Sequence, residues 1–340
     1  NFDRAFEVWY RSLRLRRFLG PEAEIPALGK VGALAWDTGK RKLDIQFIGD
    51  RLIAAAAALP AEPERSLVRS LAVAYEQLRL SDRAVAIYER LLPDTPAAER
   101  EAMLLKIGQL YQARFNYPEA IAAYEQLLDL SGDRGDSVTE TLYLRELIGL
   151  YTSAERFEQS LAARERLRTQ YAENPDTAVN IPALLVAIGD DYAVLERVDA
   201  ASVTYQEAYQ EAWSLRQFAT AADALIQLGA LYERFERPEP AVRVYNALTQ
   251  VQQRSRDLLG VVQTYDRLGN LHLAQDDPAQ ALAAFENALS LARTLQYEPG
   301  RFAQKVEQAR NRLTRSRNRS PQPRNRLPQT PSNRLPQPRQ

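Results

Sequence analysis

The chain has 340 residues, and 45% of them are hydrophobic, so it can build hydrophobic cores and is not globally disordered. Cysteine is absent, which excludes disulfides and thiolate metal sites, and no apolar run approaches the length of a membrane span. The net charge is zero, but residues 310–340 hold nine of the 44 basic residues and no acid; the other 309 residues therefore carry 35 basic and 44 acidic groups, a net charge of −9.

The first predicted element is an amphipathic helix over residues 2–19. Its expected apolar anchors are Phe2, Phe6, Trp9, Leu13 and Phe18. We interpret residues 1–24 as an N-terminal capping helix that covers the first repeat.

A pattern of small and aromatic residues recurs along residues 25–298. In its clearest copy, Gly108 is followed by Tyr111, Ala120, Tyr124 and Leu127, at offsets of three, twelve, sixteen and nineteen residues. Copies start at residues 32, 72, 108, 148, 189, 229 and 269; the copy at 148 is weak, and the one at 32 keeps little beyond an aromatic residue. We expect the small residue and the alanine on facing helices of one hairpin, with both aromatics between that hairpin and its neighbour.

Turn signals agree with this division into helix hairpins. The predicted second helices open with capping residues or with proline, as at Ser81, Asn116, Pro238 and Pro278. Together, these residues resemble the tetratricopeptide repeat family over roughly residues 25–300. The resemblance implies an all-α fold, a right-handed α-solenoid of about seven helix hairpins. The spacing of mostly 40 residues resembles a variant of the family with longer helices.

The C-terminal region divides into two predicted segments. Residues 299–316 are typical of a C-terminal capping helix. Residues 317–340 are rich in Arg, Pro, Gln and Asn, a composition that predicts disorder. This basic tail could be an inert end, a tether to anionic membrane or nucleic acid, or a ligand for another domain.

The sequence offers little for catalysis. His272 is the only histidine, and it occupies a position that is tyrosine in most repeats, so we expect it to be packed and hydrogen-bonded in the core. Metalloprotease, phosphate-loop and nucleophile-elbow motifs are absent from the sequence. We therefore predict that the chain is not an enzyme and has no small-molecule substrate.

The resemblance implies a concave groove, lined by the first helices, that binds partner peptides. Positions six, three and two before the small residue, and one after it, are expected to face inward. Carried over to this sequence, they include Arg69, Lys106, Gln109, Arg145, Asp190, Asp223, Asp266 and Asn270. We expect a groove that is more basic in its first half and more acidic in its second, although Glu146 and Arg267 carry the opposite signs. The alternative is an ordinary solvated face.

Asp190 and Asp191 form an acidic pair where other repeats carry at least one apolar residue. Two carboxylates would suit a hard divalent cation such as manganese, magnesium or calcium. The alternatives are contact with a basic peptide and a local adjustment with access to water. We predict no other cofactor.

These observations favour a scaffold that holds an extended protein segment, with a role in assembly or targeting. The absence of cysteine and the start without methionine favour an exported, periplasmic location over a cytoplasmic one. In these respects the chain is also similar to the periplasmic tetratricopeptide proteins of photosystem II biogenesis, which are linked to manganese supply and reaction-centre precursor binding. The alternative is a regulator tethered to membrane or nucleic acid by its basic tail, without a transmembrane span.

Overall fold

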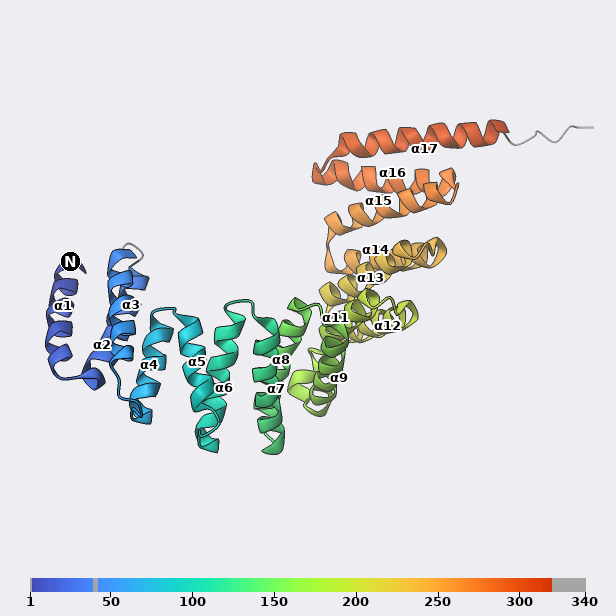
Figure 1. Cartoon of the computed structure of the whole chain (residues 1–340). Helices are drawn as coiled ribbons and strands as arrows, with labels where there is room; N and C mark the ends of the chain where they lie inside the picture. Colours follow the sequence, from blue (N-terminus) through green and yellow to red (C-terminus); the bar gives the residue numbers. More distant parts are fainter. Residues whose placement is uncertain (1, 39–41, 320–340) are drawn as a thin grey trace, which may run out of the picture. The chain divides into compact units, whose positions relative to one another are not determined.

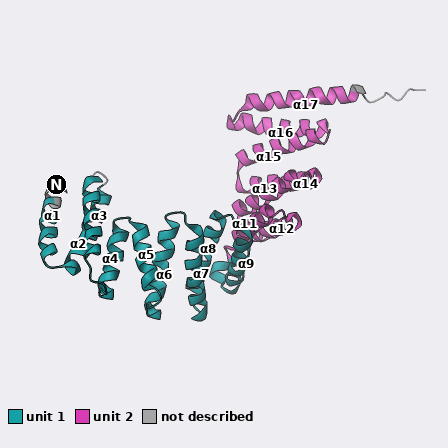
Figure 2. Cartoon of the chain, in the orientation of Figure 1, with its two compact units in different colours: residues 1–178 teal, residues 179–340 magenta. Residues whose placement is uncertain are grey.

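The structure is a computed structural model that describes the backbone of residues 2–38 and 42–319 and the side chains of residues 7–38 and 42–317. Throughout these described residues, the regular elements are helices (Figure 1), which confirms the prediction of an all-α fold. The chain divides into two compact units, unit 1 at residues 1–178 and unit 2 at residues 179–340 (Figure 2). No described helix combines the length and apolar character needed to cross a membrane.

Unit 1 consists of consecutive antiparallel helices. They are α1 (Phe2–Phe18), α2 (Pro21–Asp37), α3 (Lys42–Ala57), α4 (Arg65–Gln77), α5 (Ser81–Leu91), α6 (Ala97–Gln112), α7 (Tyr117–Asp133), α8 (Ser137–Ser153), α9 (Phe157–Glu173) and the short α10 (Pro175–Ala178). The pairs α2/α3, α4/α5, α6/α7 and α8/α9 each form a hairpin, and α1 packs on α2.

Unit 2 continues in the same way. Its helices are α11 (Ile181–Val194), α12 (Val198–Ser214), α13 (Phe218–Arg234), α14 (Pro238–Ser255), α15 (Leu258–Ala274), α16 (Pro278–Leu295) and α17 (Pro299–Arg319). The pairs α11/α12, α13/α14 and α15/α16 form hairpins, and α17 packs on α16 through Phe302, Val306 and Ala309, all buried. The predicted tail beyond residue 319 lies outside the described residues.

The alanine of the repeated pattern lies at the centre of its hairpin. Every copy that has alanine twelve residues after the small residue buries it completely: Ala84, Ala120, Ala201, Ala241 and Ala281. A larger side chain would push the two helices of the hairpin apart, because protein interiors are close-packed. The pattern therefore identified the contact between paired helices correctly.

The second aromatic packs against the small residue of its own hairpin, a contact that the sequence did not predict. A Cβ atom on Gly229 would stand 2.5 Å from the ring of Tyr245, and one on Gly189 would stand 2.5 Å from the ring of Tyr205. This aromatic therefore lies within its own hairpin, in the space that the small residue leaves. It also reaches the next hairpin, as predicted: the Tyr124 ring lies 6.3 Å from that of Tyr143 on α8, and Arg267 on α15 donates a 3.1 Å hydrogen bond to Tyr245. The prediction missed only its packing against the small residue.

The first aromatic does bridge neighbouring hairpins, as predicted. The Tyr111 hydroxyl on α6 donates a 2.5 Å hydrogen bond to Glu89 on α5. In the same way, Tyr151 on α8 donates a 2.6 Å hydrogen bond to Glu125 on α7. In these two copies, the hydroxyl thus ties the first helix to the second helix of the hairpin before it.

The first hairpin departs from this scheme. A Cβ atom on Gly32 would stand 2.5 Å from Leu78, just after α4, rather than near an aromatic of its own hairpin. The Trp36 indole donates a 3.0 Å hydrogen bond to the Leu78 carbonyl, and the Arg79 guanidinium lies 4.9 Å from the centre of its ring. Here the glycine and the tryptophan fasten α2 to the following hairpin.

Helix α1 is attached less completely than the sequence suggests. Leu13 is buried, and Trp9 and Tyr10 are half-buried. Phe18, a predicted anchor, is 88% exposed, because α1 ends there and none of the described helices covers this side. The side chains of Phe2 and Phe6 lie outside the described residues.

Candidate functional site

A depression lies between the first helices α4 and α6 of unit 1. Its volume is about 330 Å³, and its lining includes Arg69, Val73, Ala102, Met103 and Lys106. It is therefore formed by the helices on which the sequence analysis placed the partner-binding groove.

Two ion pairs frame this depression, and both join α4 to α6. Arg69 pairs with Glu99, and the Lys106 ammonium lies 2.6 Å from the Glu76 carboxylate. The positive charge comes from α4 in the first pair and from α6 in the second. The four groups are partly exposed, so each keeps capacity for further hydrogen bonds.

The floor between the ion pairs is apolar. Val73 on α4 is 39% exposed, Ala102 on α6 is exposed, and Met103 lies buried beneath them. Tyr88 on α5 also lines the depression, and its hydroxyl donates a 3.1 Å hydrogen bond to Glu76. Burial, and secondarily the Glu76 carboxylate, raise the pKa of Tyr88, so it remains a neutral donor that orients Glu76.

Sequence reasoning found Arg69 and Lys106 but missed their acidic partners. Each acid is separated from its cation by 30 residues in the sequence and lies on the first helix of the neighbouring hairpin. A search for opposite charges at that separation would have revealed the pairing. Because both cations are paired with glutamates, this stretch of the face is not the basic surface that the sequence analysis expected.

Gln109 and Arg145 lie outside the ion-paired frame. Both side chains are exposed, Gln109 on α6 three residues after Lys106 and Arg145 on α8. Neither residue lines the depression.

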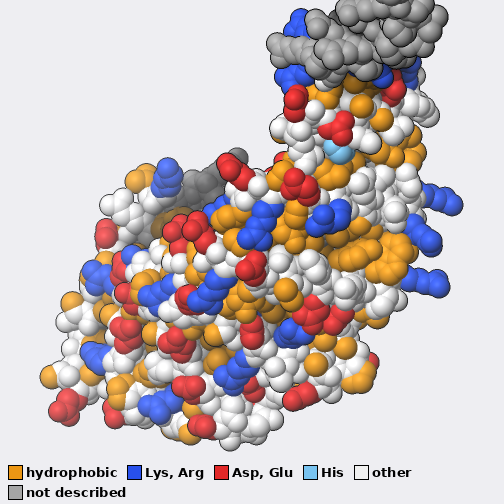
Figure 3. Space-filling model, turned by 90° about the vertical axis from the view of Figure 1, so that its right-hand side faces the viewer, with side chains coloured by type: hydrophobic (Ala, Val, Ile, Leu, Met, Phe, Trp, Pro, Cys, Tyr) orange, Lys and Arg blue, Asp and Glu red, His pale blue; other side chains and the backbone are white. Residues whose placement is uncertain are grey.

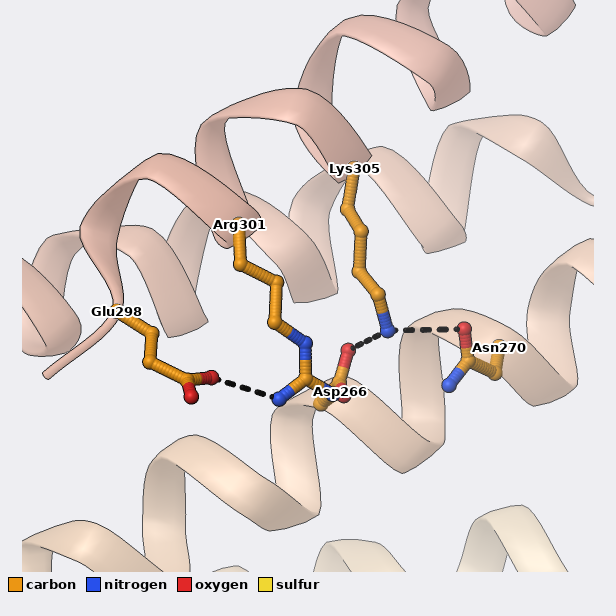
Figure 4. Close-up of polar contacts among 5 residues, drawn as sticks. All are labelled: Asp266, Asn270, Glu298, Arg301 and Lys305. Carbon is orange, nitrogen blue, oxygen red and sulfur yellow. Dashed lines mark hydrogen bonds and ion pairs between the residues drawn. The ribbon is translucent and has the colours of Figure 1, made fainter.

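In unit 2, Asp266 and Asn270 come together, but they face a helix of the chain itself. Asp266 on α15 is only 9% exposed, and it accepts a 2.9 Å hydrogen bond from Arg301 and another from Lys305, both on α17 (Figure 4). Lys305 also donates to Asn270 at 3.4 Å. The structure thus uses these two residues to hold α17, whereas the sequence analysis placed them on an open groove.

The remaining predicted residues of unit 2 do not converge. Asp190 is half-buried and accepts a 2.7 Å hydrogen bond from Tyr205, whose pKa is raised by burial and then by this carboxylate. Asp191 is 3% exposed, whereas Asp223 on α13 is exposed. The described residues contain no group of three or more His, Asp or Glu side chains placed to hold a metal ion. A cation at Asp190 and Asp191 stays a prediction, which calorimetric titration with manganese would test.

His272 is half-buried in α15, at the position of the first aromatic, and is thus less enclosed than the packed core histidine that the sequence predicts.

Comparison with known proteins supports the repeat assignment. Models of the tetratricopeptide repeat family match residues 66–102 and 103–138 in unit 1 and residues 220–294 in unit 2. No curated protein shows significant similarity to this sequence.

Several solved structures resemble the chain at low identity. BtubC (BKLC) from P. vanneervenii is 18% identical, with a TM-score of 0.38 over 76% of this chain and 96% of that one. The C-terminal part of a TPR repeat-containing protein from Cytophaga hutchinsonii is 13% identical, with a TM-score of 0.45 over 78% and 96%. Aspartyl phosphate phosphatase F from Bacillus subtilis is 12% identical, with a TM-score of 0.46 over 86% and 84%. The matches to the tetratricopeptide repeat models thus fall in both units, at residues 66–138 in unit 1 and 220–294 in unit 2.

Proposed function

We propose that this chain is a non-enzymatic scaffold that binds an extended segment of a partner protein on the first helices of unit 1, and that it acts in assembly or targeting. Tetratricopeptide repeats generally mediate protein–protein interactions and are typically non-catalytic. The observation that carries the proposal is the depression between α4 and α6, with its apolar floor and an ion pair at each end.

Each part of the depression suits a different part of a peptide. An apolar side chain of the partner can cover Val73 and Ala102 and so remove their surface from water. Arg69 and Lys106 can donate to peptide carbonyls, and Glu76 and Glu99 can accept from peptide amides. Because the charges alternate around the frame, the depression favours a peptide with a polar backbone and one apolar anchor over a strongly charged one.

Peptide selection on the immobilised full chain tests this proposal. We expect selected peptides to share an apolar anchor, and Ala102→Arg to weaken their binding by about tenfold or more, because the arginine fills the depression. Ala86→Arg is the matched control, since Ala86 is an exposed alanine on the second helix α5. Equal binding to wild type and Ala102→Arg, or the selection of no peptide at all, would contradict the proposal.

The basic tail supports a second candidate function. Residues 317–340 contain arginine but no acidic residue, so they could tether the scaffold to anionic membrane or to RNA. Vesicle and RNA binding, measured at low and high salt with and without these residues, tests the tether. Salt-insensitive binding, or binding unchanged by removal of the tail, would argue against it.

A periplasmic location and a role in photosystem II biogenesis belong to the same proposal. They rest on the missing cysteines and on the architecture of the chain. Fractionation of the native cells tests the location directly, and recovery of the protein with the cytoplasmic fraction would remove this part of the proposal.

A further inference from the structure

The exposed side of α1 carries apolar residues in a regular arrangement. Val8 is 62% exposed, Leu15 68% and Leu19, just after the helix, 75%. At 3.6 residues per turn, these three positions fall within about 40° of one another around the helix axis. These three form an apolar stripe on the side of α1 opposite its buried Leu13, and Phe18, which is 88% exposed, lies further round the helix, beyond Arg11.

Arginines flank the apolar stripe on both sides. Arg11 and Arg16 are exposed, and the helical periodicity places one on each side of the line through Val8, Leu15 and Leu19. Arg14 and Arg17 are exposed as well, so residues 7–18 contain four arginines and a single acid, Glu7, for a net charge of +3. The rest of the α1 surface is therefore mainly cationic.

From this arrangement we infer that α1 docks unit 1 on a membrane surface that contains anionic lipids. The apolar stripe would enter the boundary between headgroups and acyl chains, and the flanking arginines would reach up to the phosphates. A convex helix face with cations on both sides matches a flat interface, whereas a peptide-binding site is concave. In Figure 1, α1 is the outermost helix at its end of unit 1, with α2 on one side.

A second copy of the chain fits this surface less well. Four apolar side chains fall well short of the about 800 Å² per partner that a stable interface buries. A symmetric pairing of two α1 helices would also bring the arginines of one copy close to those of the other. Helix α17 of unit 2 differs in this respect, because its apolar Phe302, Val306 and Ala309 are buried.

A fluorescent label tests the docking of α1 independently of the basic tail. Because the chain has no cysteine, Leu19→Cys provides a single attachment point for an environment-sensitive dye on the full-length protein. We expect the emission to shift to the blue with vesicles of phosphatidylcholine and phosphatidylglycerol, but not with vesicles of phosphatidylcholine alone. Val203→Cys, a site that is 63% exposed in unit 2, is the control and should not shift.

Vesicle flotation of a charge variant completes the test. The double change Leu15→Asp and Phe18→Asp alters only exposed side chains, so helix content should stay constant by circular dichroism. We expect it to weaken binding to anionic vesicles by about tenfold or more, because it places two carboxylates among the exposed apolar side chains of α1. If the dye does not shift on protein that is bound to vesicles, the binding comes from the tail and not from α1. If the protein does not float with any vesicle, the exposed apolar side chains of α1 bind a protein partner instead. Either result overturns the inference.

Discussion

Units 1 and 2 share the pattern of small and aromatic residues, although its copy at residue 148 in unit 1 is weak, and unit 2 repeats its backbone geometry more regularly. In unit 2, the turns within hairpins have a left-handed residue at 196, 236 and 276, and the turns between hairpins have one at 216, 256 and 296. Both series advance by 40 residues, in step with the glycines at 189, 229 and 269. Unit 1 keeps the turns within hairpins, at 79, 115 and 155, but its connections between hairpins vary.

This difference in connections changes how the helices of unit 1 meet. The loop between α3 and α4 and the loop between α5 and α6 differ in length and conformation, and only the turn after α7 has a left-handed residue, Gly135. The depression between α4 and α6 follows the second of these loops. In unit 1, a changed period therefore accompanies a depression between successive first helices.

The largest expected effect concerns the close packing of unit 2. Gly229→Leu would drive a side chain into the ring of Tyr245, and we expect the free energy of unfolding to fall by about 3 kcal/mol. Chemical denaturation followed by circular dichroism measures this loss, and hydrogen exchange assigns it to unit 2. The control is Gly149→Ala in unit 1, because no atom lies within 4 Å of the new Cβ and helix propensity should add about 1 kcal/mol. Equal unfolding midpoints for the two variants would show that unit 2 is no more closely packed.

The next effect concerns the attachment of α17 to α15. Asp266→Ala would leave Lys305 and Arg301 without their shared carboxylate, and we expect a loss of about 2 kcal/mol, less than for a fully buried pair because the cations are partly exposed. Hydrogen exchange of residues 299–319 should speed up before the rest of unit 2. Glu298→Ala is the control, since its pair with Arg301 is half-exposed and should contribute less than about 0.5 kcal/mol. Unchanged exchange in Asp266→Ala would mean that apolar contacts alone hold α17.

A smaller effect concerns the turns that set the period. Arg216 has a φ of 58°, and we expect Arg216→Gly to raise the free energy of unfolding by about 0.5–1 kcal/mol, because glycine adopts this conformation without strain. The reciprocal change in unit 1 is Gly135→Ala, at a φ of 65° with no neighbouring atom within 4 Å, and it should cost about 1 kcal/mol. Thermal unfolding of both variants measures the two changes in stability. Unfolding midpoints that shift in the same direction in both variants would refute this account of the turns.

The repeated pattern predicted the helices and the buried alanines, because each depends on a local period in the sequence. The turns were harder to predict: their left-handed residues include Phe115, Glu196 and Arg216, which give no turn signal of their own. Only their fixed distance of seven or 27 residues from the small position would have identified them.

The polar contacts of the candidate site were the least predictable part. Arg69 and Lys106 were expected on the first helices, but the sequence did not indicate that Glu99 and Glu76 would come within reach of them. Such contacts depend on the angle between successive hairpins, which the irregular loops of unit 1 determine. Asp266 likewise appeared to face a groove, because the pattern did not show that α17 would lie against α15.

The smallest effect concerns a polar contact in unit 1, which links α6 to α8 and to the turn that precedes α8. Glu101 accepts a 2.6 Å hydrogen bond from Arg134 and a 2.7 Å hydrogen bond from Tyr143, and these two bonds hold its pKa below the usual range. A carboxylate with a lowered pKa in the folded state stabilises the fold above its unfolded pKa of about 4.3, and that contribution is lost as the pH falls through the folded value. We therefore expect the stability of unit 1 to decrease more steeply in acid for the wild type than for Glu101→Gln, as measured by hydrogen exchange of α6 and α8. The control is Glu239→Gln, at an exposed site in unit 2, which should leave the dependence of unit 1 stability on pH unchanged. If Glu101→Gln and the wild type lose stability equally steeply in acid, this contact does not make the stability of unit 1 depend on pH.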